Sequence, residues 1–549
     1  METCQEQYDY FHTIIQGLLD TFLPMVEVTK CNTDKPWVNN SFKNLITKRQ
    51  AAWKGNKASY KYYRNLVNTA AKRLRPTWYK NQVSSLKSTK ANEWWKKTKL
   101  LTGLTQDKSS FEGMADKICE GDLNRLASDA GSFFHSISGN LEPLKPDLVP
   151  PCNDEPLPEK FTIKLYELEK LLLNTKVTKS PGPDQIPNWI LHDLAGLISK
   201  PLCAIMNSSL REGCLPDIWK MANVSPIPKV PKPEIISKDI RPISLTPTLS
   251  KCMEHFIANW LWDSVKDKLK SNQYGGIKKS STTHALIDML HYWYSELEKS
   301  NTVRIVLLDY TKAFDKVDHN ILINKLLTMD TPQVLLRWIA NFLSNRNMRV
   351  CINSAVSEWF TLNGSIPQGS CLAPLLFVIM MNDLEPSCKS SKFMDDVTLS
   401  DSFRDPASSK LQCSLNETIK WSEVNKQDLN PVKTKDIIVK LNADDRPIKD
   451  LMIGNMPVQT VESSKLLGLV LNNQLSWSDH VYYLHSKASK RLYFLIMLKR
   501  SGLSTDDLIT YYTSVIRSVL EYACPAWSTS LTKGEIEKLE TLQKRALSI

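Results

Sequence analysis

The sequence predicts a mixed α/β or α+β fold, and three observations support this prediction. Helical patterns alternate with short β-branched runs at Val303–Tyr310, Met348–Asn353, Asp436–Leu441 and Leu466–Leu471. The flanking residues 1–141 and 476–549 show helical patterns without such runs. Hydrophobic residues make up 42% of the 549 residues and charged residues 23%, which is typical of a globular protein. We therefore expect a core of interleaved strands and helices, flanked in the chain by helical segments.

Composition divides the chain into four parts. Residues 1–141 are expected to form a helical, basic N-terminal extension. Six prolines fall within the seventeen positions 142–158, which predicts a stiff linker. The alternating strands and helices occupy 159–475. Residues 476–549 are expected to form a helical C-terminal region, and because the chain stops within a helical pattern we expect a truncated product.

Composition also excludes several classes of protein. The longest nearly unbroken apolar run, Cys371–Met381, contains Pro374, whereas a membrane helix needs about 20 apolar residues. Five acids precede the first basic residue, Lys30, so no signal or transit peptide is expected. The twelve cysteines form no C-x-x-C pair and no zinc-ligand cluster. We expect reduced thiols in an intracellular protein, nuclear or cytoplasmic.

The positive charge is concentrated in one stretch. Residues 41–100 hold sixteen Lys and Arg and one acid, Glu93, so this stretch carries +15 and the rest of the chain −3. Its single Gly and single Pro predict helices, and aromatic residues such as Trp53, Tyr62 and Trp78 alternate with the charges. A polyanion would offset this charge and rings can stack on bases, so we expect contact with nucleic acid. The alternative is a solvated helical face whose aromatic rings pack on the protein.

Two carboxylate motifs are candidates for metal binding. In VRIVLLDYTKAFDKVDH an apolar run ends at Asp309, which places a carboxylate at the end of a buried strand. In SKFMDDVTLSD the pair Asp395–Asp396 lies where a strand, a turn and a second strand are expected, and adjacent carboxylates repel unless a cation offsets them. If the three met, they could hold two divalent ions about 3.5–4 Å apart. The alternative is an ordinary surface turn at the paired acids.

Two further motifs suit substrate binding. Gln368 and Gly369 lie in a turn before an apolar helix, where the glycine allows close backbone approach to a ligand and the amide can bond a base or sugar. Lys229 and Arg241 lie on a strand-turn-strand pattern, near one end of facing strands, where they would suit a triphosphate. A capped loop and two surface cations are the alternatives.

Six segments taken in order resemble the reverse transcriptases of non-LTR (LINE-like) retrotransposons: RPISLTPTLSK, LDYTKAFDKVDH, GSIPQGSCLAPLLF, FMDD, LNPVKTK and KLLGLVL. The resemblance covers about residues 160–475 and extends with lower specificity into both flanks. It implies a right-hand polymerase with fingers, a palm built on a ferredoxin-like antiparallel sheet, and a helical thumb. It also implies DNA synthesis from dNTPs on an RNA template and a DNA primer or target, with two Mg²⁺ ions, Mn²⁺ being possible.

The resemblance assigns roles residue by residue. Asp309, Asp395 and Asp396 match the metal-binding catalytic triad. Lys433 matches the lysine that protonates the leaving pyrophosphate, with Lys435 as the alternative. Phe314 matches the residue beneath the incoming sugar, where its ring would exclude a 2′-hydroxyl. Lys229 and Arg241 match residues that bind the triphosphate. Gln368 and Gly369 match the loop beside the nascent base pair, and Leu467-Gly468 matches the hairpin that grips the primer.

The chain departs from the family in a few places. Met394 stands where Ala is more frequent, Gly276 and Ile277 where Phe and Arg are usual, and Ser365 where Gly is frequent. We expect no endonuclease domain in the first 150 residues, and no zinc knuckle or RNase H pattern after the polymerase segments. Two other functions stay open, namely a catalytically inactive, truncated or domesticated nucleic-acid-binding fragment and an RNA-dependent RNA polymerase. Phe314 argues against the latter, since ribonucleotides need room there.

Overall fold

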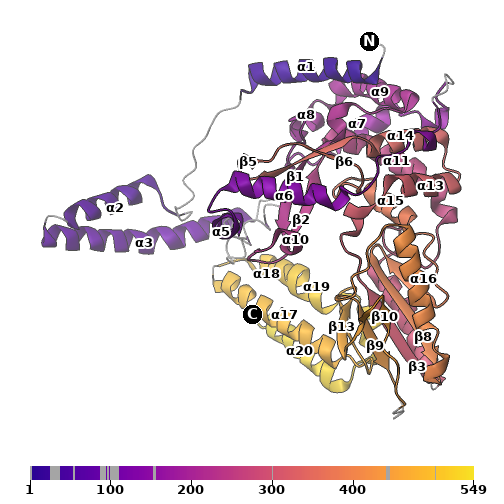
Figure 1. Cartoon of the computed structure of the whole chain (residues 1–549). Helices are drawn as coiled ribbons and strands as arrows, with labels where there is room; N and C mark the ends of the chain where they lie inside the picture. Colours follow the sequence, from indigo (N-terminus) through magenta and orange to yellow (C-terminus); the bar gives the residue numbers. More distant parts are fainter. Residues whose placement is uncertain are drawn as a thin grey trace. The chain divides into compact units, whose positions relative to one another are not determined.

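The computed structural model describes residues 3–24, 37–53, 56–86, 94, 98, 110–151, 156–299, 301–440, 446–500 and 502–549 (Figure 1). Parts of the predicted basic stretch (54–55, 87–93, 95–97 and 99–100), residues 152–155 of the predicted linker, Leu441 and the side chain of Trp78 lie outside this description. The chain forms a mixed α/β structure with two compact units, Met1–Pro24 with Lys108–Ser476 and Met25–Asp107 with Trp477–Ile549. None of the described helices is both long and apolar enough to cross a membrane.

One five-stranded sheet belongs to the first unit. Its strands follow the order β12 (Gln459–Thr460), β9 (Lys435–Val439), β3 (Thr302–Leu308), β8 (Asp396–Phe403) and β7 (Lys389–Phe393). The central strand β3 runs antiparallel to both β8 and β9, and all seven of its residues are buried. Helix α12 (Thr282–Glu298) packs on β3 and β7. Helix α16 (Leu411–Val424) packs on β8 (Figure 1). A nearly continuous apolar run is what a strand in such surroundings requires.

A second five-stranded sheet belongs to the same unit. Its strands are β2 (Ile240–Leu245), β1 (Met221–Pro228), β4 (Arg346–Ile352) and β5 (Ala355–Val356), with β6 (Phe360–Leu362) also paired to β4. Helix α6 (Leu123–Ser138) covers β4 with an apolar face, and Leu126, Ala130 and Phe134 are buried there. A Cβ on Gly131 of this helix would lie 2.6 Å from the Phe360 ring, so only glycine permits this close packing.

Further helices complete the first unit, and several of them pack on one another. They are α1 (Cys4–Phe22), α5 (Ser110–Ile118), α7 (Leu165–Leu173), α8 (Asn188–Asp193), α9 (Ala195–Glu212), α10 (Ile236–Asp239), α11 (Thr248–Val265), α13 (His319–Thr328), α14 (Gln333–Leu343) and α15 (Ala373–Met380). Short hairpins are formed by β10 (Met452–Ile453) with β11 (Met456–Pro457) and by β13 (Ser463–Leu466) with β14 (Leu469–Asn472).

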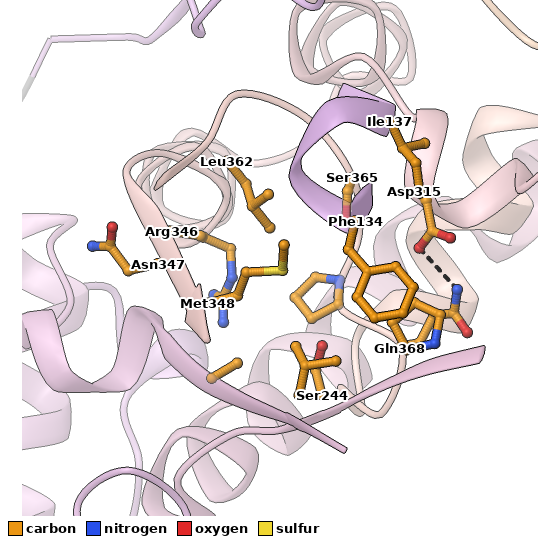
Figure 2. A pocket seen from close by; sticks show the side chains of 14 residues that line it. Phe134, Ile137, Ser244, Asp315, Arg346, Asn347, Met348, Leu362, Ser365 and Gln368 are labelled. Carbon is orange, nitrogen blue, oxygen red and sulfur yellow. Dashed lines mark hydrogen bonds between the residues drawn. The ribbon is translucent and has the colours of Figure 1, made fainter. Parts of the chain in front are cut away.

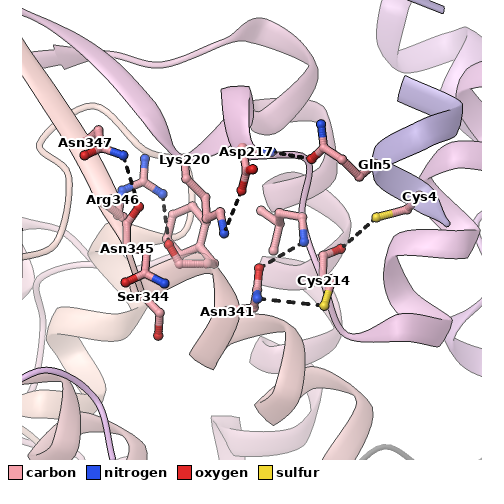
Figure 3. A network of polar contacts seen from close by, with 12 residues as sticks. Cys4, Gln5, Cys214, Asp217, Lys220, Asn341, Ser344, Asn345, Arg346 and Asn347 are labelled. Atoms are coloured by element: carbon pink, nitrogen blue, oxygen red, sulfur yellow. Dashed lines mark hydrogen bonds and ion pairs between the residues drawn. The ribbon is translucent and has the colours of Figure 1, made fainter. Parts of the chain in front are cut away.

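The N-terminal helix α1 is joined to this unit by apolar and polar contacts. Tyr8 is buried and its ring meets Trp219 edge-on at 5.5 Å. The backbone nitrogen of Cys4 donates to the Glu212 carboxylate at 2.9 Å. Gln5 accepts a hydrogen bond from the Asp217 backbone nitrogen at 2.8 Å, within the polar network drawn in Figure 3. These contacts make α1 part of the unit that contains both sheets, although it begins near residue 1.

The described residues of the second unit are mostly helical. Helices α2 (Asn40–Trp53) and α3 (Lys57–Leu86) pack against each other. The C-terminal part comprises α17 (Ser478–Arg500), α18 (Thr505–Tyr511), the π-helical segment η7 (Tyr512–Arg517), α19 (Ser518–Leu520) and α20 (Lys533–Leu547), with α17 packed on α20.

The observed strands differ from the predicted runs in their bounds, and two of the differences bear on the site. The run Val303–Tyr310 ends as a strand at Leu308. The run Leu466–Leu471 is divided by a turn, because Leu467 and Gly468 have φ values of 45° and 93°, which an extended strand does not allow. Leu467-Gly468 therefore lies at the tip of the β13–β14 hairpin.

Candidate active site

Asp309 and Asp396 lie at neighbouring ends of two paired strands. The last pair between the antiparallel strands β3 and β8 is Leu308 with Val397. Asp309 and Asp396 are therefore the next residues along each strand. Residues opposite each other in antiparallel strands have Cα atoms about 4.5–5.5 Å apart. The sheet thus brings together two acids that are far apart in the chain.

Asp395 occupies the tight turn between β7 and β8. Phe393 pairs with Asp396, which leaves Met394 and Asp395 as the two turn residues, and Met394 has a φ of 60°. A Cβ on Gly276 would lie 2.6 Å from Met394 Cε. The two departures from the family pattern are therefore complementary, because the long side chain at 394 fills space that a side chain at 276 would need.

The three carboxylates repel one another. Burial and the Asp309 charge raise the pKa of Asp395, while Arg241 lowers it. Partial burial, followed by the charges of Asp395 and Asp309, raises the pKa of Asp396 to about 6, although the residue as a whole is exposed. The Oδ2 atom of Asp309 is buried without a hydrogen bond and lies 3.3 Å from Lys433 Nζ in an ion pair. A cation bound here would relieve this repulsion.

The donor chemistry fits magnesium, but the side chains do not surround a single point. Within the described ranges, no three His, Cys, Asp or Glu side chains converge closely enough to hold an ion. Mg²⁺ usually takes one or two carboxylates and completes its shell with water and substrate phosphates. Asp309, Asp395 and Asp396 could supply such carboxylates, with the rest of the shell coming from outside the protein.

The predicted cations gather beside these acids. Ile227 of β1 pairs with Arg241 of β2, and Lys229 follows the end of β1. Burial and the charges of Arg241 and Lys433 lower the pKa of Lys229, so the three cations are close enough to repel one another. Lys433 reaches Asp309, whereas the Lys435 ammonium donates to Val432 O and Gln459 Oε1. The geometry therefore favours Lys433 over Lys435 as the lysine nearest the acids.

The turn at Gln368 and Gly369 packs against β2. Gly369 has a φ of 124°, and a Cβ there would lie 2.6 Å from Ser244 O. The close backbone approach that this glycine permits is therefore made to Ser244, whereas the sequence led us to expect a ligand. Gln368 O accepts from Ser244 N at 2.7 Å, and Gln368 Nε2 donates to Asp315 Oδ1 at 2.8 Å (Figure 2).

Phe314 is held in a fixed orientation. It belongs to the 3₁₀ turn η5 (Ala313–Lys316), and its ring stacks on Phe377 of α15 with centroids 4.3 Å apart and planes 13° apart. Its carbonyl accepts a hydrogen bond from Ile366 N at 3.0 Å. A stacked, partly buried ring cannot easily move aside, which is what steric exclusion of a 2′-hydroxyl would need.

Three described aromatic residues of the basic stretch differ in their exposure. Trp53 and Tyr62 on the α2–α3 pair are 70% and 60% exposed. Trp94 is buried, and its Nε1 donates to Asp507 Oδ1 at 3.0 Å. Packing on the protein, the alternative considered for this stretch, therefore applies to Trp94, while Trp53 and Tyr62 are available to a ligand.

Sequence reasoning missed two carboxylates that touch the Gln368 turn. Asp315 directly follows Phe314 in the motif LDYTKAFDKVDH, and this position next to a predicted site residue could have identified it. Glu254 lies on a helix face shared with the buried Met253 and Ile257, and a buried acid on an apolar face indicates a functional or structural role.

Two cavities adjoin the described residues of the first unit. A small cavity of about 30 Å³ lies beside Asp315 and Gln368 (Figure 2). A larger cavity of about 1260 Å³ lies between α16 and residues 446–454, and none of the predicted site residues lines it.

Comparison with known proteins shows which family the sequence resembles. Residues 227–472 match the family described as reverse transcriptase (RNA-dependent DNA polymerase). The chain is similar to the protein named probable RNA-directed DNA polymerase from transposon X-element of Drosophila melanogaster, with 25% identity over 395 residues, covering 69% of this chain and 43% of the relative. It is also similar to the RNA-directed DNA polymerase from mobile element jockey of Drosophila melanogaster, with 24% identity over 402 residues, covering 70% and 43%. A third relative is the Retrovirus-related Pol polyprotein from type-1 retrotransposable element R1 of Bradysia coprophila, with 22% identity over 466 residues, covering 80% and 44%. The chain matches less than half the length of each of these relatives.

Proposed function

Because residues 227–472 belong to the reverse transcriptase family, we propose that this chain is an RNA-directed DNA polymerase of a non-LTR retrotransposon. It transfers a nucleotide from a dNTP to the 3′-hydroxyl of a primer annealed to RNA. The observation that carries the proposal is the pairing of β3 with β8, which sets Asp309 beside Asp396 and next to the turn that contains Asp395.

The residues of the site divide the work among themselves. Asp309, Asp395 and Asp396 would hold two Mg²⁺ ions, or Mn²⁺. Ions bound there would activate the attacking hydroxyl and offset charge on the leaving pyrophosphate. Lys229 and Arg241 bind the triphosphate through charge-assisted hydrogen bonds. Lys433, whose Nζ lies 3.3 Å from Asp309, donates a proton to the pyrophosphate.

The architecture supports a right-hand assignment. The β12-β9-β3-β8-β7 sheet corresponds to the palm, the β1–β2 hairpin with its neighbouring helices to the fingers, and α17 to α20 to the thumb. The β13–β14 hairpin corresponds to the primer grip. The basic stretch 41–100 would hold template RNA or target DNA by its phosphates, with the exposed rings of Trp53 and Tyr62 beside it.

A metal-dependent extension assay on primed RNA tests the proposal. The double variant D395N/D396N should lose extension while a filter assay shows nearly unchanged RNA binding, because Asn keeps the shape and removes the charge. The matched control is D263N, which alters an exposed acid on α11 and should leave extension intact. Extension by the double variant at the normal rate would refute the site assignment, and binding without incorporation by the unaltered chain would favour a non-catalytic fragment.

The choice of nucleotide distinguishes a DNA polymerase from an RNA polymerase. The unaltered chain should use dNTPs in preference to rNTPs, because the Phe314 ring is held against Phe377. F314A should gain rNTP use. Equal use of both nucleotides by the unaltered chain would favour an RNA polymerase.

A further inference from the structure

We propose that Glu254 and Asp315 are positioning residues that hold the Pro367–Ser370 turn, and with it Gln368, in the orientation needed to receive the incoming nucleotide. The inference rests on the proposed polymerase function, in which Gln368 lies beside the nascent base pair. Neither residue needs to touch substrate, since both act through the turn.

Glu254 holds the exit of the turn. This carboxylate is fully buried on α11, where a charged group requires several hydrogen-bond donors. Its Oε2 accepts from Ser370 Oγ at 2.5 Å, from Cys371 N at 2.7 Å and from Leu372 N at 3.4 Å. Its Oε1 accepts from Ser250 Oγ on the same helix at 3.1 Å. The residues directly after Gly369 are therefore fastened to α11.

Asp315 holds the side chain of Gln368. The carboxylate accepts from Gln368 Nε2 at 2.8 Å (Figure 2). Burial raises the pKa of Asp315 to about 6, although part of the residue stays accessible. Because this value is still below 7, most of the carboxylate is ionised at neutral pH. An ionised carboxylate only accepts hydrogen bonds, so the amide must turn its NH₂ group towards Asp315. The direction of the Gln368 carbonyl is set by this contact.

A third contact completes the support of the turn. Ser244 N of β2 donates to Gln368 O at 2.7 Å, so the backbone at Gln368 is fixed as well. The elements that hold the turn are also those that carry Arg241, on β2, and Phe314, on η5. These contacts therefore fix the position of Gln368 relative to the residues expected to bind the triphosphate and the sugar.

The small cavity explains why loss of Asp315 should affect orientation more than folding. About 30 Å³ of space adjoins Asp315 and Gln368 and is bounded by Arg346, Met348 and Phe134 (Figure 2). Such a volume is large enough for a water molecule. A Gln368 amide released from Asp315 would have room to turn, and water could replace the lost partner without collapse of the turn.

Single-nucleotide incorporation on primed RNA, with KM for the dNTP and kcat measured separately, tests the inference. D315A and Q368A should each raise KM by roughly tenfold, the size expected for one hydrogen bond to a charged group, with little change in melting temperature. The double variant should be no worse than either single variant, since both remove the same contact. D315N, whose side-chain oxygen can still accept from Gln368, should stay within about twofold of the unaltered chain.

Further variants keep the test decisive. E254Q should raise KM in the same direction, because the amide can no longer accept from all the donors of the turn, and the exposed D263A on the same helix is its control. D315S replaces D315A if the latter does not fold. If the effects of D315A and Q368A multiply, or if D315A lowers only the melting temperature, the inference is overturned while the proposed function stands. If the unaltered chain shows no extension at all, both the inference and the proposed function are refuted.

Discussion

Lys392 should hold the hairpin of Asp395 and Asp396 against the end of helix α15. The residue is completely buried, and its ammonium donates to the carbonyls of Met381 at 2.9 Å, Asn382 at 3.1 Å and Leu384 at 3.1 Å. These carbonyls follow the C-terminus of α15, where backbone acceptors lack helical partners. Lys392 lies on β7, the strand that leads into the Met394–Asp395 turn. Its ammonium therefore links this strand to the carbonyls that follow α15.

The cost of K392M can be worked out from these contacts. Each hydrogen bond from a charged donor contributes about 2 kcal/mol, so losing the three that Lys392 makes costs about 6 kcal/mol. Burial lowers the pKa of Lys392 from 10.5 to about 8, and removing this penalised charge returns about 3 kcal/mol. We expect K392M to lose about 3 kcal/mol of unfolding free energy, together with polymerase activity.

Urea denaturation at pH 7, followed by primer extension, measures both effects. The matched control is K389M on the same strand, because Lys389 is half-exposed and pairs with Asp288 at the surface, where a salt bridge contributes at most about 1 kcal/mol. If K392M unfolded at the same urea concentration as K389M, the ammonium would not hold these two elements together and the reasoning would fail.

Three further predictions follow from individual residues. Burial lowers the pKa of His319 from 6.5 to about 4, so the fold favours the neutral ring; the stability that this gives is present above pH 6.5 and should be lost, by up to about 3 kcal/mol, as pH falls towards 4. Urea midpoints measured from pH 7 to 4 should therefore fall more steeply for the unaltered chain than for H319N, and parallel curves would contradict this. Ser365 has a φ of 80°, so S365G should gain roughly 0.5–1 kcal/mol in the same denaturation assay, whereas a loss would show that the serine is not strained. G276A should lower the melting temperature because its Cβ would meet Met394 Cε at 2.6 Å, and M394A should restore part of the loss; additive losses in the double variant would argue against the contact.

Some features of the site were predictable because they depend on neighbouring residues in the chain. An apolar run ending at Asp309 predicted a buried strand with an acid at its end, and β3 ends at Leu308. The turn at Asp395 and the helix after Gln368 followed from local pattern in the same way. The order of motifs also predicted the reverse transcriptase family, which the match over residues 227–472 confirms although the relatives are only about 25% identical.

Other features could not be predicted, because their partners lie far away in the chain. Asp315 and Gln368 are separated by 53 residues, and Glu254 and Ser370 by 116. The glycine at 369 was correctly singled out, but its neighbour is the Ser244 carbonyl, which no local pattern identifies. Likewise, no local pattern showed that the Lys433 ammonium pairs with Asp309 while that of Lys435 pairs with Gln459.

Local sequence therefore indicated which residues carry charge, where most strands and helices lie, and which family the central segment resembles. Packing alone decided that β3 pairs with β8, that α1 and α6 belong with the sheets, and that two carboxylates hold the Gln368 turn. The physical reason is that periodicity and turn preference act over a few residues, whereas hydrogen-bond partners and steric limits are set by whatever the fold brings within about 3–4 Å.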